Sequence, residues 1–179
     1  MKPLSAQRNR VIAAALVPLS CAALMLAACG QTTETPPKPA EITRDTACTL
    51  DGMLLADYPG PKAQIHYAEG QPEFFCDTIE MFSIYLRPEQ QRRVRAMFVQ
   101  DMGKTDWNDP RGHWIDAKTA FYVMGSSRRG SMGPTLASFS SEQDASAFAQ
   151  KYGGRVLRFD EVKPDMVVLD GGVIRDRMH

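Results

Sequence analysis

KAQIHYAEGQPEFFCDTIEMFSIYL, residues 62–86, is the stretch that decides the fold. Within it, residues 63–67 alternate between apolar and polar side chains, which predicts a β-strand. Residues 73–76 predict a second strand, because glycine and proline residues between the two segments favour a turn. Further along the chain, residues 95–100 predict a third strand.

A short helix is predicted between the second and third strands. Asp77 occupies the expected N-cap position, and Glu80 follows three residues later, as in a capping box. The apolar residues around Glu80 form one face of an amphipathic helix, which stops before Pro88. The order of strand, strand, helix and strand defines a small ββαβ unit.

The same order recurs in the second half of the chain. Residues 119–124 and 136–139 predict two strands, and residues 155–162 predict a final one. Ser140 is the predicted N-cap of the intervening helix, with Gln143 in the capping-box position, and Gly153-Gly154 is the predicted end of that helix. We therefore predict an α+β protein in which two small ββαβ units share part of their core and form one compact module.

The composition divides the chain into five parts. Residues 1–28 are the predicted signal peptide, and residues 29–46 are a proline-containing tether with too few large apolar residues to form a core. The first ββαβ unit is assigned to residues 47–110 and the second to residues 111–165. Residues 166–179 form a C-terminal tail.

The first 28 residues have the pattern of an export signal. Lys2, Arg8 and Arg10 supply a positive start, and residues 11–28 are mostly apolar and end in small side chains. A proline and a serine interrupt this run, which makes it unsuited to be a permanent membrane span.

The end of this signal resembles the bacterial lipoprotein box. Leu26-Ala27-Ala28-Cys29 predicts cleavage before Cys29 and lipid modification of its thiol, although an ordinary signal followed by an unrelated cysteine is the alternative. We therefore expect a protein that is lipid-anchored to a cell membrane and faces the periplasm. Gly30 stands where an aspartate would resemble an inner-membrane retention signal, which favours the outer membrane.

Charge and motif content exclude several classes of function. All 21 acidic residues follow residue 28, whereas three of the 21 basic residues precede it, so the mature chain has a net charge of about −3. It has no basic patch that would indicate a nucleic-acid partner. Phosphate-binding loops, Ser/His/Asp signatures, zinc-spaced histidines and Cys-x-x-Cys motifs are all missing from the sequence. We predict that the chain is not an enzyme.

Two methionines are candidate ligands for a soft metal ion. Met53 lies in an Asp-Gly-Met segment and Met132 in a Gly-Ser-Met-Gly-Pro segment, so each is in a glycine-flanked turn. Thioethers favour Cu(I) over harder cations. Met81 and Met97 instead lie in apolar periodic segments, where methionine commonly fills gaps in a core. We expect the turns of Met53 and Met132 to meet where the two units join.

Cys48 and Cys76 are the remaining thiols once the signal peptide and Cys29 are excluded. In an exported protein they could form a disulfide, or Cys48 could bind a metal while Cys76 packs in the core. His66, in the first predicted strand, is either a hydrogen-bonded strand residue or a borderline ligand.

Several motifs together resemble the NosL family, which comprises accessory lipoproteins of nitrous oxide reductase. The resemblance runs through nearly the whole mature chain in the same order. It rests on Pro59-Gly60-Pro61 followed by Lys62-Ala63-Gln64-Ile65, on Trp114-Ile115-Asp116-Ala117, on Tyr122-Val123-Met124-Gly125-Ser126 and on Ser131-Met132-Gly133-Pro134.

The resemblance implies a membrane-anchored periplasmic copper chaperone. Such a protein would hold Cu(I) and deliver it for assembly of the copper centres of nitrous oxide reductase. Its implied partners are a membrane transporter complex of the maturation machinery or the reductase itself. The implied fold is a pair of ββαβ units, similar to part of organomercurial lyase, and this likeness transfers no activity.

The sequence departs from the family pattern at one position. The family often has Cys-Gly-Met, whereas this chain has Asp51-Gly52-Met53, and its cysteine is three residues earlier, at Cys48. Cys48 can take the family role only if the loop folds back. We predict one Cu(I) bound by Met53, Met132 and Cys48, with His66 as an optional fourth donor.

The main alternative is a lipid-anchored structural or docking module. It would contain a Cys48–Cys76 disulfide and bind no metal. An enzyme like organomercurial lyase is a third possibility, but the chain lacks the several clustered cysteines that it would need.

Overall fold

The structure, a computed structural model, describes residues 35–169. The predicted signal peptide, Cys29 and the first part of the tether lie outside these residues. The chain divides into two units, residues 1–35 and 36–179, and every helix and strand below belongs to the second. Within residues 35–169, no helix is both long and apolar enough to cross a membrane.

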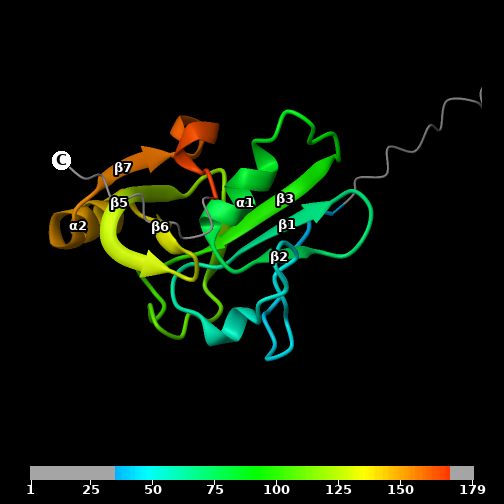
Figure 1. Cartoon of the computed structure of the whole chain (residues 1–179), viewed down its shortest axis with the longest axis horizontal. Coiled ribbons are helices and arrows are strands. Elements are labelled where there is room, and N and C mark those ends of the chain that lie inside the picture. The colour runs from blue at the N-terminus through cyan, green and yellow to red at the C-terminus, as the bar shows by residue number, and fades with distance from the viewer. Residues whose placement is uncertain (1–34, 170–179) are drawn as a thin grey trace, which may run out of the picture. The chain divides into compact units, whose positions relative to one another are not determined.

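The first sheet has four antiparallel strands. β1 lies between β2 and β3 (Figure 1), and β4 pairs with the other edge of β3. One helix, α1, follows β2 and packs against β1 and also against the second sheet. The elements are β1 (Ala63–Tyr67), β2 (Glu73–Phe75), α1 (Thr78–Tyr85), β3 (Val94–Gln100) and β4 (Trp114–Asp116).

The second sheet has three antiparallel strands, with β5 between β6 and β7. Its elements are β5 (Phe121–Gly130), β6 (Gly133–Phe139), α2 (Glu142–Tyr152) and β7 (Arg155–Arg158). The order of strand, strand, helix and strand in each half confirms the predicted α+β fold.

Several strands differ from the sequence prediction, and β4 was not predicted at all. β4 falls within residues 111–165, assigned to the second unit, but it pairs with β3 in the first sheet. β5 runs to Gly130, so the glycine-flanked segment around Met132 is the tight turn of a hairpin. β7 ends at Arg158 because Phe159 turns into the core and contacts the rings of Phe82 and Tyr85.

The start of α1 confirms the predicted cap but not the capping box. The Asp77 carboxylate accepts a hydrogen bond from the backbone N–H of Ile79 at 3.0 Å. Glu80 does not return to the N–H of Asp77. Its Oε2 accepts instead from the backbone N–H of Cys76 at 3.0 Å, outside the helix. Glu80 is therefore available for a different structural role.

The predicted cap of α2 is wrong by one residue. Ser141 is the N-cap, and its hydroxyl accepts from the backbone N–H of Asp144 at 3.3 Å. The Ser140 hydroxyl is committed elsewhere, because it donates to the Asp101 carboxylate in the loop after β3. The helix ends at Gly153, as predicted.

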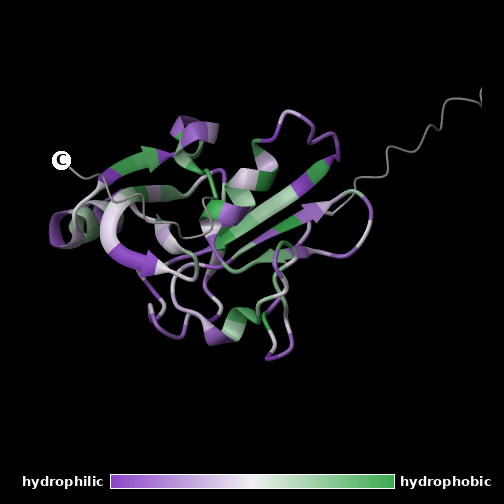
Figure 2. Cartoon of the chain, in the orientation of Figure 1, coloured by the Kyte–Doolittle hydropathy of each residue, from purple (hydrophilic) through white to green (hydrophobic). Residues whose placement is uncertain are grey.

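The two sheets and α1 share one core. Ile65, Phe82, Tyr122 and Leu136 are buried within it, as are the two methionines that the sequence assigned to the core, Met81 and Met97. The Thr78 hydroxyl also donates to the Leu136 carbonyl at 2.6 Å, which joins α1 to β6. In Figure 2, β3 is coloured mostly hydrophobic, whereas the loop after α1 is mostly hydrophilic.

Candidate metal centre

The loop before β1 folds back on itself and brings Cys48 next to Met53. The backbone N–H of Cys48 donates to the Met53 carbonyl at 2.8 Å, and the N–H of Gly52 donates to the Cys48 carbonyl at 2.9 Å. Gly52 has a φ of 79°, a conformation that glycine adopts without steric cost. The chain thus meets the condition under which Cys48 can replace the cysteine of the Cys-Gly-Met pattern.

The same loop is attached to the end of β2, where Cys76 follows the strand. The backbone N–H of Thr49 donates to the Phe74 carbonyl at 2.8 Å, which places Cys48 beside Cys76. Both cysteines are buried and both are free. The structure therefore brings the two thiols together without the Cys48–Cys76 disulfide of the predicted alternative.

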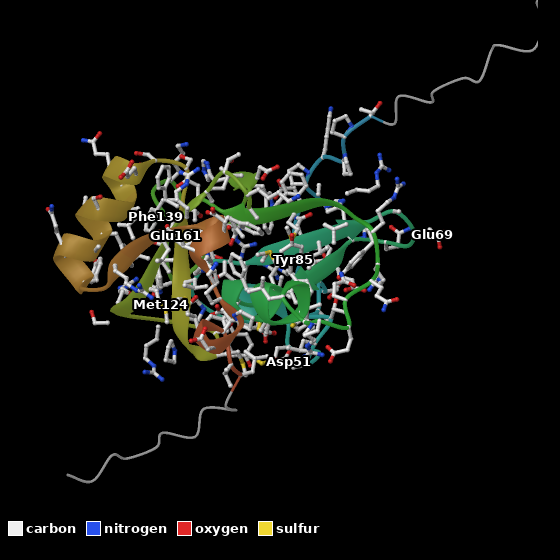
Figure 3. The ribbon with its side chains drawn as sticks, turned by 90° about the horizontal axis from the view of Figure 1, so that it is seen from above. Asp51, Glu69, Tyr85, Met124, Phe139 and Glu161 are labelled. Carbon is white, nitrogen blue, oxygen red and sulfur yellow. The ribbon has the colours of Figure 1, made fainter. Side chains whose placement is uncertain are left out.

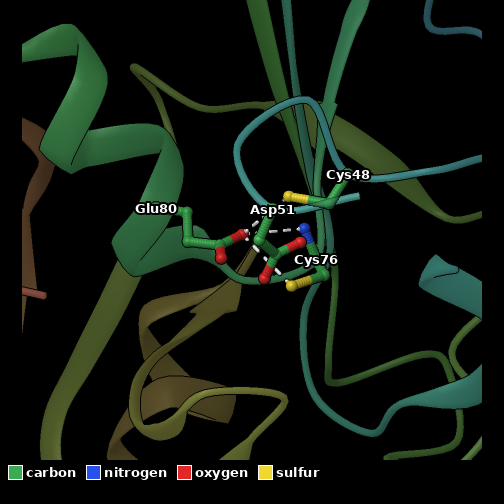
Figure 4. Close-up of side chains that lie close together, drawn as sticks. All are labelled: Cys48, Asp51, Cys76 and Glu80. Carbon is green, nitrogen blue, oxygen red and sulfur yellow. Dashed lines mark hydrogen bonds between the residues drawn. The ribbon is translucent and has the colours of Figure 1, made fainter. Parts of the chain in front are cut away.

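The two thiols instead share one carboxylate oxygen. Cys48 Sγ lies 3.3 Å and Cys76 Sγ 3.2 Å from Oε2 of Glu80, and each thiol can donate a hydrogen bond to it. Figure 4 shows the Glu80 side chain reaching from α1 toward both sulfur atoms. The carboxylate acts as a common acceptor for two thiols that come from different segments.

Met53 and Met132 pack against the buried cluster that contains this pair of thiols. Cys48 and Cys76 form a small buried cluster with Leu55, and both methionines lie partly buried at its edge. The Met132 turn is held there because the Ser131 hydroxyl donates to the Cys76 carbonyl at 2.6 Å. Both turns therefore pack against the same buried residues, and we call Cys48, Met53, Cys76 and Met132 the sulfur cluster.

Two carboxylates complete the arrangement, and the sequence did not single them out as ligands. One ligand atom from each of Cys48, Asp51, Cys76 and Glu80 lies within 4.8 Å of the others. Asp51 is exposed, whereas Glu80 is only 1% exposed. In the sequence, the hint of a ligand role for Glu80 is that it follows Cys76 by one helical turn. The same position also fits a capping residue.

The structure places His66 outside the sulfur cluster. Its Nε2 lies 2.7 Å from Oε1 of Gln64, which also accepts from the backbone N–H of Ala40. The imidazole packs edge-on against Phe98, and burial lowers its pKa. Of the four predicted ligands, the structure gathers Cys48, Met53 and Met132 but not His66.

The two thiols have unlike tendencies to ionise. The hydrogen bond from Cys76 lowers the pKa of Cys48, against the opposing effect of burial. The pKa of Cys76 is raised, first by that same hydrogen bond and then by burial. A thiol has one proton, so Cys76 can donate it either to Glu80 or to the sulfur of Cys48, but not to both at once. Cys48 is therefore the member of the pair that first becomes a thiolate.

Two further charged groups are buried behind the thiols. Lys62 donates from Nζ to the carbonyls of Cys76 at 3.1 Å and Pro59 at 2.9 Å, and burial lowers its pKa to about 8. Burial raises the pKa of Asp77 to about 6, although its Oδ1 accepts from the Thr135 hydroxyl at 2.7 Å. The site is thus backed by a cation and a carboxylate that water does not reach.

Asp77 is expected to make stability depend on pH. Its pKa is about 6 in the folded protein and 3.8 in the reference state, so the folded protein binds more protons between these values. Stability attributable to Asp77 therefore falls as pH rises from 4 to 6, by up to about 3 kcal/mol. Urea unfolding from pH 4 to 7 measures the free energy of unfolding of the wild type and of Asp77→Asn. The difference between the two proteins should fall as the pH rises. A constant difference would contradict the prediction.

The fold and the site together define a small α+β protein in which paired ββαβ units gather four sulfur side chains where they meet. The sequence profile of the NosL family matches residues 39–167. The chain belongs to the NosL family.

Three related proteins show how close this relationship is. The copper-binding lipoprotein NosL of Stutzerimonas stutzeri is 47% identical over 116 residues, which cover 64% of this chain and 60% of that relative. The protein of the same name from Achromobacter cycloclastes is 37% identical over 156 residues, which cover 84% of this chain and 80% of the relative. The crystal structure of the copper chaperone NosL from Shewanella denitrificans has 41% identity and a TM-score of 0.69, and the match covers 73% of this chain and 99% of that one.

Proposed function

We propose that this chain is a membrane-anchored periplasmic copper chaperone, which binds Cu(I) and delivers it for assembly of the copper centres of nitrous oxide reductase. The observation that carries the proposal is the sulfur cluster, in which two free thiols and two thioethers converge from three separate segments. The names of the relatives, copper-binding lipoproteins and a copper chaperone, support the same function.

The proposed donors are Cys48, Met53 and Met132, with Cys76 as a second thiol beside them. Thiolate and thioether sulfurs are soft ligands, which suit Cu(I) better than harder cations. Cys48 supplies the thiolate because its pKa is the lower of the pair. His66 is left out of this set because its ring is held by Gln64, away from the sulfur atoms.

The distribution of burial among the donors suits an ion that must be transferred to a partner protein. The two thiols are buried, at 3% and 0% exposure, whereas Met53 and Met132 are only partly buried and Asp51 at the rim is exposed. A partner's ligand can approach from the side of the thioethers and replace them before it reaches the thiolate. The partner on this route is the transporter complex of the maturation machinery or the reductase itself.

The anchoring part of the proposal rests on the sequence and on the relatives. The lipoprotein box at Cys29 predicts a lipid anchor, and two relatives are named lipoproteins. Cys29 lies outside the described residues. We propose that the anchored protein faces the periplasm, at the outer membrane rather than the inner, and we assign it no catalytic residues.

Replacement of both thioethers tests the copper site. Met53→Leu combined with Met132→Leu is expected to lower the affinity for Cu(I) by about ten- to a hundredfold, because leucine keeps the packing volume and removes the donor. The measurement is an anaerobic titration against a coloured Cu(I) chelator. Met81→Leu combined with Met97→Leu is the matched control, since both methionines lie in the core. Unchanged affinity in the first variant would show that the proposed site is wrong.

A further inference from the structure

Three aromatic side chains form a row beside α2, the helix that packs on the second sheet. The indole of Trp107, in the loop between β3 and β4, stacks on the ring of Phe148, with centroids 5.4 Å apart and planes inclined by 20°. Tyr152 ends α2, and the centroid of its ring lies 4.8 Å from that of Phe148. Each of the three rings is only partly buried, so the row presents apolar faces at the surface.

Two cations lie over these rings. The guanidinium carbon of Arg128, in β5, is 4.7 Å from the ring centroid of Trp107 and 5.4 Å from that of Tyr152. The Nζ atom of Lys151 is 5.0 Å from the Tyr152 centroid. A ring face attracts a cation and orients it, but has no net charge with which to neutralise it. We call Trp107, Arg128, Phe148, Lys151 and Tyr152 the cation–aromatic patch.

Neither cation of the patch pairs with a carboxylate within residues 35–169. The acidic residues that flank the indole in the sequence have other partners. Asp109 pairs with Arg111 at 2.8 Å. Oδ1 of Asp106 accepts from the backbone N–H of Asn108 at 2.7 Å. The acidic residues of α2 lie in its first turn, whereas Lys151 lies in its last. The patch therefore carries two positive charges without a paired carboxylate in the described part of the chain.

The rings of the patch are held in place by the residues beneath them. The indole Nε1–H of Trp107 donates to the Arg129 carbonyl at 3.0 Å, which fixes the orientation of the ring. The ring of Phe148 rests on Phe139, a buried residue of β6, with centroids 5.1 Å apart. Rings that are already ordered lose little conformational entropy when a partner binds. Tryptophan, tyrosine and arginine are also the residue types that contribute most to protein–protein binding, so composition and rigidity both favour a protein-binding role.

The patch lies apart from the tether and from the metal centre. The tether joins the first sheet, because the backbone N–H of Ala40 donates to Oε1 of Gln64 in β1 at 2.8 Å. In Figure 1 the first described residues and α2 lie at opposite ends of the two sheets. Figure 3 shows Phe139 near α2 and well apart from Asp51, which is in the loop of the sulfur cluster. A partner on the patch would leave the sulfur cluster open. Because the proposed lipid anchor is reached from the other end, a protein suits the patch better than the anchoring membrane does.

We propose that the cation–aromatic patch is a docking surface for a separate protein partner that presents carboxylate side chains beside apolar ones. The carboxylates would accept charge-assisted hydrogen bonds from Arg128 and Lys151, and the apolar side chains would cover the rings of Trp107 and Tyr152. Contacts of this kind combine a desolvated aromatic centre with charged groups that fix the orientation of the partner. The inference goes beyond the proposed function, since it uses no ligand of the sulfur cluster.

Synthetic polymers of glutamate are the probe for this surface. The chain has two tryptophans, Trp107 and Trp114, so Trp114→Phe leaves the indole of the patch as the only one that fluoresces. The full-length chain with this change, purified in detergent, is titrated with poly-L-glutamate and with a random copolymer of glutamate and tyrosine. We expect a saturable change in Trp107 emission with both polymers and severalfold tighter binding of the copolymer, whose tyrosines can cover the rings. Binding should weaken about tenfold when the salt concentration rises from about 20 to about 200 mM.

Neutral variants of the two cations locate the binding. Arg128→Gln combined with Lys151→Gln is expected to weaken the binding of both polymers at least about tenfold, because both charge-assisted contacts are lost. Lys118→Gln combined with Lys163→Gln is the matched control, since it removes the same charge from two exposed residues outside the patch. Thermal melts followed by circular dichroism check that both variants fold. Equal losses in the two variants, or equal affinity for the two polymers, would overturn the docking surface.

Two further measurements distinguish the other possible occupants. The full-length Trp114→Phe chain should have the same Trp107 emission in vesicles of phosphatidylglycerol as in vesicles of phosphatidylcholine. A change specific to phosphatidylglycerol that Arg128→Gln abolishes would assign the patch to the membrane surface and overturn the inference. Self-association in sedimentation velocity that Arg128→Gln abolishes would assign the patch to a second copy of this chain, and would overturn the assignment to a separate partner.

Discussion

Serine in place of Cys48 is expected to lower the affinity for Cu(I) more than about a hundredfold. The serine hydroxyl is a hard, protonated group, whereas Cys48 is the thiol whose pKa is lowered and which first becomes a thiolate. Because the side chain is buried, no water molecule or exposed ligand can easily take its place. Anaerobic competition with a Cu(I) chelator measures the loss in the purified protein.

The same variant has a consequence in cells if the delivery proposal is right. Nitrous oxide reductase isolated from cells that produce only Cys48→Ser should contain less copper than reductase from wild-type cells. Met81→Leu, which changes a core methionine of α1, is the control for general damage to the chain. A reductase with a full complement of copper would contradict delivery by this protein, and wild-type Cu(I) affinity would contradict the role of Cys48.

Alanine in place of Gly60 is expected to destabilise the fold by about 3 kcal/mol or more. Gly60 has a φ of 82°, and a Cβ atom there would lie 2.7 Å from the Cα of Gly130 at the end of β5. The obstacle is backbone rather than a mobile side chain, so relief requires that the two segments move apart. Urea unfolding followed by tryptophan fluorescence measures the change in the free energy of unfolding.

Gly70→Ala separates the collision from the backbone conformation. Gly70 has a similar φ of 90°, but a Cβ atom there would meet nothing within 4 Å. This variant should be destabilised only by the cost of a left-handed conformation at an alanine, roughly 1–2 kcal/mol. Equal losses at Gly60 and Gly70 would show that the close approach to Gly130 contributes nothing to stability.

Elements whose signals lie within a few consecutive residues could be predicted from the sequence. Local pattern and turn chemistry predict the Asp77 cap and the end of α2 at Gly153. They also predict the order of strand, strand, helix and strand along the chain. The cap of α2 was misplaced because Ser140 and Ser141 are equivalent as local signals. Only the contact between Ser140 and Asp101, from a distant loop, distinguishes them.

The candidate site was only partly predictable for the same reason. Met53 and Met132 were identified because glycine neighbours mark their turns, and both lie at the sulfur cluster. Glu80 was interpreted as a capping residue, because a glutamate three residues after an N-cap has that pattern whether or not it closes the box. His66 was included on residue type alone, and in the structure its Nε2 is hydrogen-bonded to Gln64 instead.

The sequence by itself predicts an export signal, and it determined the two ββαβ units and the supply of soft sulfur donors, because each depends on residues that are near neighbours along the chain. Tertiary structure alone decided that Cys48 meets Glu80, 32 residues away, and that Ser131 reaches the Cys76 carbonyl across 55 residues. Such meetings depend on strand pairing and on close contacts such as Gly60 against Gly130. Long-range packing, which no single segment encodes, therefore turns separate thiols, thioethers and carboxylates into one site.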